Sequence, residues 1–258
     1  MNEMPSFDLD GQVAVVTGSS RGLGKWIALG LAQAGADVLV TYCGSRHDGE
    51  DTLAQITALG RRAHLVQVDV GDVDSIQAMV HTAVDELGGL DIMVNNAGIN
   101  VRTPALEMTP EDFDAVVRIN QRGVYFGCQA AARVMVERGG GRIINMASAA
   151  AFLVRKTLPL SVYAMTKAGV VMLTKALAAE WAPYGINVNA VAPGYFATPL
   201  TAVPLADPKL YKRIIEFTPL SRVGEAKDIM GVVAFLASEA ANFITGQTLS
   251  IDGGRTVL

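Results

Sequence analysis

Cysteine and histidine are scarce in this chain of 258 residues. The two cysteines, Cys43 and Cys128, are far apart, and the three histidines, His47, His64 and His81, are scattered. Two such cysteines give no disulfide framework, and single histidines lack the spacing of a metal site. The sequence therefore excludes a disulfide-stapled fold, predicts no bound metal and suits a reducing, cytoplasmic setting.

Charge of one sign and long apolar runs are lacking as well. The formal net charge is -4, 18% of the residues are charged, and no dense block of Lys and Arg occurs. Nucleic acid and anionic membranes are therefore not expected as partners. No apolar run has the length of a membrane span, and the first residues carry acids instead of the apolar core of a signal peptide. Since 50% of the residues are hydrophobic, we expect a single domain over residues 1–258 with a large core.

Short apolar runs with β-branched residues alternate with helical patterns along the chain. The expected strands are Val13–Thr17, Asp37–Val40, Ala63–Val68, Ile92–Asn95, Arg142–Met146, Asn187–Val191 and Thr248–Ile251. The expected helices are Leu23–Ala34, Glu50–Ala58, Asp74–Leu87, Glu111–Arg138, Tyr163–Ala182 and Ala226–Ala237. Such strands are typical of a parallel sheet that is buried on both faces. The order predicts an α/β fold, a doubly wound parallel seven-stranded sheet of Rossmann type, with ligands at the carboxyl ends of its strands.

Two of the expected helices carry unusually little charge. Gly123–Val136 has one charged residue, Arg133, and Tyr163–Ala182 has three. A helix with so wide an apolar surface is buried on more than one side, either in the core of one chain or in a subunit interface. We favour the interface and expect an oligomer. Between the last two helices, Ala202–Pro219 has three prolines and no clear period, which predicts either a mobile lid at about 195–220 or a rigid surface excursion.

A glycine-rich turn, Thr17–Gly24, follows the first expected strand and opens the first helix. Gly18 suits a tight turn, Gly22 a close approach of a pyrophosphate, and Gly24 close packing of helix on strand. The helix N-terminus offers N–H groups and a favourable dipole to phosphates. A glycine turn alone is weak evidence, but its place between strand and helix favours a dinucleotide site.

The end of the second strand decides between NAD and NADP. An acid there would hold the ribose diol of NAD, but the strand ends Val40-Thr41-Tyr42-Cys43. Asp37 lies at the wrong end of this strand, and Asp48 and Glu50 come too late.

Two cations stand near the same place. Arg21 lies in the glycine turn, and Arg46 follows the second strand. Arginines are suited to the 2′-phosphate of NADP, although both could be solvated surface residues. We therefore favour NADP, and Tyr42 leaves NAD open.

Tyr163 and Lys167 are four residues apart, so one face of a helix carries both. A phenol has a pKa of about 10 and is a poor base at neutral pH. A cation about 4 Å away, at an effective dielectric constant of about 20, supplies roughly the 4 kcal/mol needed to bring that pKa to about 7. We expect Lys167 to lower the pKa of Tyr163, which then acts as the acid–base group. The alternative is an ordinary surface pair.

Two further polar residues stand where a substrate is expected. Ser148 follows the strand Arg142–Met146, where its hydroxyl can donate to a carbonyl as negative charge develops; the alternative is a turn serine. Asn120 falls inside the long helix, where Asn is a mediocre helix former. Its amide can hold a water of a proton relay, or it is a satisfied polar core residue.

These motifs together resemble the short-chain dehydrogenase/reductase family. The family pattern TGxxxGxG is Thr17–Gly24, and the remaining motifs follow in order as Asn95-Asn96-Ala97-Gly98, Asn120, Ser148, Tyr163 with Lys167, Pro193–Thr198 and Asp252-Gly253-Gly254. The resemblance runs from about Gly11 to Gly254 and implies the catalytic residues Asn120, Ser148, Tyr163 and Lys167. It implies that Asp69 and Val70 contact adenine, that Lys167 also holds the nicotinamide ribose, and that the enzyme is a homotetramer. The cofactor-binding residues expected from the turn and the resemblance are Gly18, Ser20, Arg21, Gly22, Leu23, Gly24, Tyr42, Asp69, Val70, Asn96, Ala97, Gly98, Tyr163, Lys167, Pro193, Gly194, Phe196 and Thr198.

The segment between Ser148 and Tyr163 is slightly longer than is usual in the family. We still expect the two side chains to pair, and the geometry of the pair depends on how this segment folds. Within it, Arg155 and Lys156 could pair with a substrate carboxylate, or they are solvated loop cations. The chain is similar to the sugar-acid branch of the family, such as gluconate 5-dehydrogenase and 2-deoxy-gluconate 3-dehydrogenase. We therefore expect an NAD(P)-dependent oxidoreductase of a sugar acid or polyol. The alternatives are a 3-oxoacyl-acyl-carrier-protein reductase, a xenobiotic or steroid ketone reductase, and a dinucleotide sensor or scaffold without catalysis.

Overall fold

A computed structural model describes residues 4–154 and 158–257. Its sheet has seven parallel strands in the order β3-β2-β1-β4-β5-β6-β7. The strands are β1 (Val13–Val16), β2 (Asp37–Tyr42), β3 (Ala63–Gln67), β4 (Ile92–Asn95), β5 (Gly141–Met146), β6 (Ile186–Pro193) and β7 (Thr248–Ile251). The predicted doubly wound fold is confirmed, and the chain reverses its direction of winding between β1 and β4. At such a point the loops on either side diverge and leave a crevice for a ligand.

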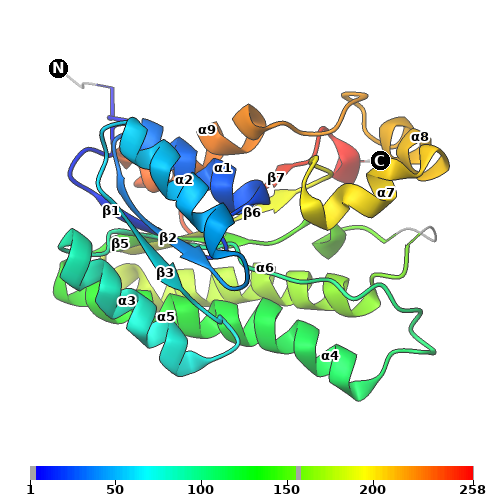
Figure 1. Ribbon diagram of the computed structural model, residues 1–258, viewed down its shortest axis with the longest axis horizontal. Helices are drawn as coiled ribbons and strands as arrows, with labels where there is room; N and C mark the ends of the chain where they lie inside the picture. Colours follow the sequence, from blue (N-terminus) through cyan, green and yellow to red (C-terminus); the bar gives the residue numbers. More distant parts are fainter. Residues whose placement is uncertain (1–3, 155–157, 258) are drawn as a thin grey trace.

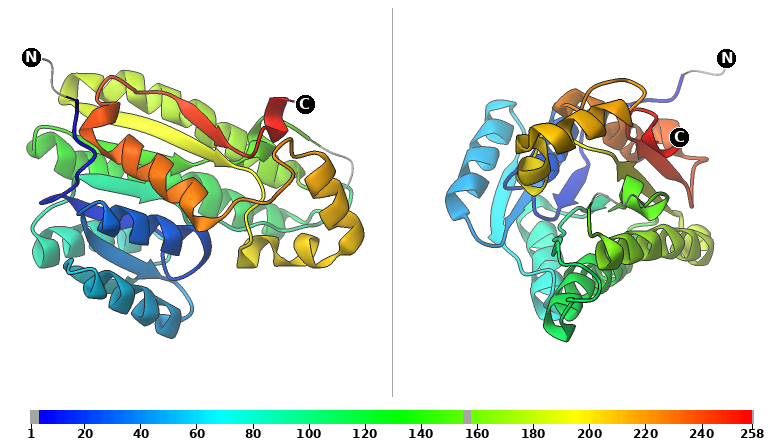
Figure 2. Two further views of the ribbon diagram at one scale, coloured as in Figure 1. Left: turned by 90° about the horizontal axis from the view of Figure 1, so that it is seen from above. Right: turned by 90° about the vertical axis from the view of Figure 1, so that its right-hand side faces the viewer.

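Helices cover both faces of the sheet (Figure 1; Figure 2 gives two further directions). One face carries α1 (Gly22–Gln33), α2 (Arg46–Ala58) and α9 (Ala226–Ala237), and the other carries α3 (Val73–Leu87), α4 (Pro110–Val117), α5 (Gly123–Glu137) and α6 (Ser161–Trp181). Each face has its own apolar core. Ile27 and Val233 pack on the first face, and Met79 and Val170 pack on the second, all fully buried. The inner strands are therefore buried on both faces, as the sequence predicts, whereas the edge strands β3 and β7 are partly exposed.

Helix α2 begins at Arg46, four residues earlier than predicted. The Ser45 hydroxyl caps it by accepting a hydrogen bond from the Asp48 N–H at 3.2 Å. Gly49 argues against a helix by propensity, but a Cβ at Gly49 would lie 2.7 Å from Leu65 Cδ1. The glycine allows α2 to pack closely on the sheet, and this packing outweighs the low helix propensity.

The helix predicted at Glu111–Arg138 is divided. It begins at Pro110, one residue earlier than predicted, with Thr109 Oγ1 accepting from the Asp112 N–H at 3.2 Å. A π-helical turn, Arg118–Arg122, then separates α4 from α5. π-turns inside α-helices are frequent at functional sites, and Asn120 lies within this one.

Helix α6, continued by the turn Ala182–Tyr184, is long and apolar enough to cross a membrane by length and composition alone. In this fold it packs against β6, β5 and α4. Val170, Leu177 and Ala178 are buried there. Only part of its apolar surface is therefore buried within the domain, 39% of the most apolar stretch.

The excursion predicted as a lid contains helices. After a short turn at Pro199–Thr201, it forms α7 (Ala202–Ala206) and α8 (Pro208–Glu216), with Asp207 capping α8. These helices project beyond the carboxyl ends of the strands (Figure 1). The chain leaves and re-enters the domain at one place, where Phe196 pairs with Gly224 in an isolated parallel bridge.

Candidate active site

One large cleft of about 670 Å³ opens at the carboxyl ends of the strands. It brings together, from the whole length of the chain, Ser148 and every residue predicted to bind the cofactor: Gly18, Ser20, Arg21, Gly22, Leu23, Gly24, Tyr42, Asp69, Val70, Asn96, Ala97, Gly98, Tyr163, Lys167, Pro193, Gly194, Phe196 and Thr198. A cleft of this size suits a small molecule or cofactor.

The glycine turn forms the middle of the cleft. Gly18 and Gly22 have backbone φ angles of +65° and +59°, which residues other than glycine rarely adopt. A Cβ at Gly24 would lie 2.2 Å from the Gly18 carbonyl oxygen, so only glycine allows α1 to start this close to β1. Thr41 Oγ1 accepts from the Gly18 N–H at 2.7 Å and fixes the turn against β2.

The start of α1 suits a phosphate. Its N-cap residue is Arg21, no side chain in the described part of the chain caps this end, and its first turn holds no acid. The N–H groups of the first turn therefore face the cleft with the positive end of the helix dipole. This is the arrangement that a pyrophosphate requires, so the residues present fit a dinucleotide.

The loop after β4 is fixed to the end of β1. Thr17 Oγ1 accepts from the N–H groups of Asn96 at 2.9 Å and Ala97 at 3.0 Å. Asn96 Nδ2 donates to the Thr17 carbonyl at 2.8 Å. The two loops at the switch point are therefore held as one wall of the cleft.

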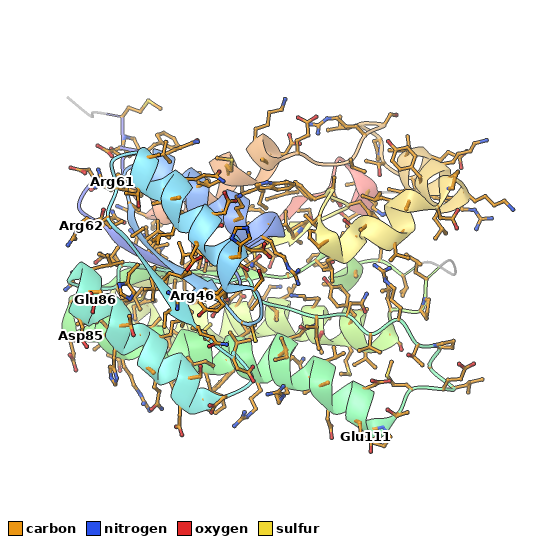
Figure 3. All side chains as sticks on the ribbon, viewed as in Figure 1. Arg46, Arg61, Arg62, Asp85, Glu86 and Glu111 are labelled. Atoms are coloured by element: carbon orange, nitrogen blue, oxygen red, sulfur yellow. The ribbon has the colours of Figure 1, made fainter. Side chains whose placement is uncertain are left out.

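The two arginines predicted to hold a 2′-phosphate differ in place. Arg21 lines the cleft, whereas Arg46 is not among the described lining residues and pairs with Glu50 at 2.8 Å. Figure 3 shows Arg46 at the start of α2, with Arg61 and Arg62 beyond the other end of that helix. Asp48, which was expected to come too late in the chain, lines the cleft, because α2 starts early and brings its first turn to the end of β2.

Tyr163 and Ser148 meet despite the longer segment between them. Burial raises the pKa of Tyr163, a hydrogen bond from the Ser148 hydroxyl lowers it, nearby Tyr195 raises it, and the Arg102 charge lowers it. The net direction predicted for this pKa is therefore wrong, because burial has the largest effect. The hydrogen bond between Ser148 and Tyr163 agrees with the pairing that the family motifs imply.

Lys167 is buried under the cleft, 3% exposed. Its Nζ donates to the Met146 carbonyl at 2.7 Å and lies 5.7 Å from the centre of the Tyr163 ring. Burial lowers the pKa of Lys167 to about 8. The ammonium therefore faces the ring. Because its pKa lies only slightly above neutral pH, it loses its proton more readily than an exposed lysine does.

Asn120 is fully buried in the π-turn and is not among the described residues that line the cleft. Its Oδ1 accepts from the Ile99 N–H at 2.9 Å, and its Nδ2 donates to the Ile99 carbonyl at 2.9 Å and to Thr166 at 3.3 Å. Both amide hydrogens have protein acceptors, so the amide holds the loop after β4, and only an Oδ1 lone pair is left for a water.

The substrate end of the cleft includes residues that the sequence analysis missed. Arg102, Tyr195 and Arg255 line it together with apolar side chains from several loops. Arg102 donates to the Leu200 carbonyl at 2.8 Å, and the Arg255 guanidinium lies 4.8 Å from the centre of the Tyr195 ring. Arg155 and Lys156, which were considered for a substrate carboxylate, lie outside the described residues.

Comparison with known proteins agrees with this geometry. A family profile described as enoyl-(acyl carrier protein) reductase matches residues 18–256. The protein is a short-chain dehydrogenase/reductase. The matched region includes the glycine turn from Gly18 onward, Ser148, and the pair Tyr163 and Lys167.

Two curated relatives of this short-chain dehydrogenase/reductase have different names. The chain is 43% identical to a 2-dehydro-3-deoxy-D-gluconate 5-dehydrogenase of Escherichia coli K12 over 252 residues, 97% of this chain and 98% of the relative. It is 41% identical to a 3-oxoacyl-[acyl-carrier-protein] reductase of Synechocystis over 247 residues, 95% of this chain and 97% of the relative. Among solved structures, a gluconate 5-dehydrogenase of Burkholderia cenocepacia in complex with NADP and tartrate has a TM-score of 0.93 and 39% identity, with 99% of each chain covered.

Proposed function

We propose that the protein is an NADP-dependent oxidoreductase that acts on a secondary alcohol or ketone of a sugar acid or polyol such as gluconate. Arg102 carries the substrate class. Its side chain lines the cleft together with Tyr163 and Ser148, where the reacting oxygen would lie. A carboxylate on the same small substrate could therefore pair with the guanidinium. The gluconate-type relatives support this class.

Bound NADP would supply or accept the hydride. The chain's own residues would do the rest: the start of α1 would hold the pyrophosphate, Arg21 the 2′-phosphate, and Lys167 the nicotinamide ribose. Tyr163 would exchange a proton with the substrate oxygen, and the Ser148 hydroxyl would donate to that oxygen as its charge grows. Lys167, facing the Tyr163 ring, would stabilise the phenolate while it exists. The Asn120 Oδ1 lone pair would hold the first water of the relay.

A substrate panel with the wild type and Arg102→Gln tests this function. We expect turnover on a free hexonate that exceeds turnover on an acyl thioester, and that is greater with NADPH or NADP⁺ than with the forms lacking the 2′-phosphate. Arg102→Gln should lower kcat/KM for the hexonate by roughly 10–100-fold, the worth of a charged hydrogen bond. It should change kcat/KM for an uncharged polyol much less.

Arg138→Gln, beside Asp91 at the opposite end of the strands from the cleft, is the matched control and should leave both rates unchanged. Preference for the acyl thioester would favour a 3-oxoacyl reductase, as the Synechocystis relative would suggest. Dinucleotide binding without turnover on any carbonyl would favour a sensor. An equal loss on charged and neutral substrates in Arg102→Gln would contradict carboxylate recognition.

We further propose a cytoplasmic homotetramer of a single domain over residues 1–258, with the excursion at about 195–220 as its substrate lid. Exposed apolar side chains on α5 and α6 support the assembly: Tyr125 and Val136 on the first, Met165 and Met172 on the second. Met172→Glu should lower the molar mass measured by light scattering, because it places a charge in an apolar interface. Lys212→Glu on α8 is the control, and a wild-type monomer would contradict the proposal.

A further inference from the structure

The cleft continues past the glycine turn, on the side away from Tyr163. Strands β2 and β3 lie on one side of β1, and β4 and β5 lie on the other. Val68, Asp69 and Val70 follow β3 and line this second end of the cleft. With the pyrophosphate on the glycine turn and the nicotinamide beside Tyr163, the adenine would lie between these valines. The inference below rests on that proposed use of a dinucleotide.

The Asp69 carboxylate is held from two directions. Its Oδ1 accepts from the Gly71 N–H at 2.8 Å, and its Oδ2 pairs with Arg118 Nη1 at 3.2 Å. The Gly71 N–H has the largest favourable effect on this carboxylate, and together with Arg118 it lowers the pKa of Asp69. The Asp69 side chain is still 44% exposed, so its remaining lone pairs can accept a hydrogen bond from a ligand.

Arg118 reaches Asp69 from the π-turn between α4 and α5. Its guanidinium crosses the loop after β3 so closely that a Cβ at Gly71 would lie 2.2 Å from Nη1. Arg122, on the same turn, donates instead to the Gly71 carbonyl at 2.7 Å. One arginine therefore holds the carboxylate and the other holds the backbone of the same loop.

An ionised carboxylate with a fixed orientation distinguishes two purines. The exocyclic amine of adenine can donate to it, whereas the carbonyl that hypoxanthine carries at the same position would repel it. We infer that Arg118 is a positioning residue that sets the base selectivity of the cofactor site, holding Asp69 so that a 6-aminopurine is preferred to a 6-oxopurine.

Binding of NADPH and of its hypoxanthine analogue, nicotinamide hypoxanthine dinucleotide phosphate, tests this inference. The two dissociation constants are measured by fluorescence titration for each variant. The wild type should bind NADPH at least about 10-fold more tightly than the analogue, the worth of one hydrogen bond to a charged group. Arg118→Gln should reduce this ratio to about threefold, and Asp69→Asn to about one, because an amide can donate as well as accept.

Arg122→Gln is the matched control from the same turn. It should weaken both ligands by the same factor, since it removes contacts to the loop backbone and to the Phe126 ring but leaves the Asp69–Arg118 pair in place. Arg118→Lys, which keeps the charge, should retain a larger ratio than Arg118→Gln and replaces it if that variant does not fold. A wild-type ratio near one, an unchanged ratio in Arg118→Gln, or equal falls in Arg118→Gln and Arg122→Gln would overturn the inference. A wild type that binds neither dinucleotide would instead contradict the proposed function.

Discussion

Tyr163→Phe is expected to lower kcat by about 10³–10⁴-fold, near the upper range of general acid–base catalysis. The hydroxyl that this variant lacks is the one that Ser148 hydrogen-bonds and that Arg102 influences, and the described part of the cleft has no second phenol paired with a serine. The ring remains, so the wall of the cleft and the dissociation constant of NADPH should stay nearly unchanged.

Steady-state rates on the best substrate of the panel and a fluorescence titration with NADPH measure the two effects. Tyr184→Phe, an exposed tyrosine just beyond the end of α6, is the matched control and should retain full activity. Turnover of Tyr163→Phe within tenfold of the wild type would remove Tyr163 from the mechanism. An equal loss of NADPH affinity would show that the variant acts on binding instead.

Lys167→Met is expected to abolish measurable turnover and at the same time to make the fold more stable at pH 7. The pKa of Lys167 falls from 10.5 to about 8 because of burial, which corresponds to about 3 kcal/mol of unfolding free energy. Methionine fits the same volume without a charge, but it leaves the Met146 carbonyl without the hydrogen bond from Nζ. The loss of that bond offsets part of the gain, so we expect a net increase of about 1–2 kcal/mol.

The pH dependence gives the sign of this effect. Below about pH 8 the lysine is protonated in both the folded and the unfolded chain, and the full cost of its burial is present. Between about pH 8 and 10.5 the unfolded chain binds more protons, so the wild type should gain stability as the pH rises through that range. Lys167→Met should lack this gain.

Urea unfolding of the wild type and of Lys167→Met at pH 7 and pH 9.5 measures the difference in their unfolding free energies. The control is Lys175→Met, an exposed lysine on the same helix, whose effect should stay within about 0.5 kcal/mol. A Lys167→Met variant that is less stable than the wild type at pH 7 would mean that the contacts of Nζ outweigh its desolvation.

Local patterns in the sequence were sufficient for most of the fold. The alternation of β-branched runs and helical periods predicts all seven strands. The π-turn at Arg118–Arg122 was not predicted, because a π-turn depends on packing against the loop after β3. The same holds for the early start of α2, which depends on Gly49 meeting Leu65.

The candidate site was predicted where its residues form motifs and missed where they do not. Ser148, Tyr163 and Lys167 are recognisable from spacing, whereas Arg102 and Arg255 are separated by most of the chain and line the same cleft only through the fold. The direction of the Tyr163 pKa shift was missed for a related reason. A sequence shows that a lysine is one helical turn away, but it does not show how deeply the phenol is buried.

The bridge between Phe196 and Gly224 has a consequence for how this enzyme could diversify. Phe196 is buried, and a Cβ at Gly224 would lie 2.4 Å from its ring. The two ends of the segment that contains α7 and α8 are therefore held side by side at the edge of the domain. If the excursion covers the substrate as proposed, a change in the length of α7 or α8 would alter that cover and leave the strand order unchanged. Substrate choice could then vary through these two helices, while the sheet and the glycine turn keep their sequence.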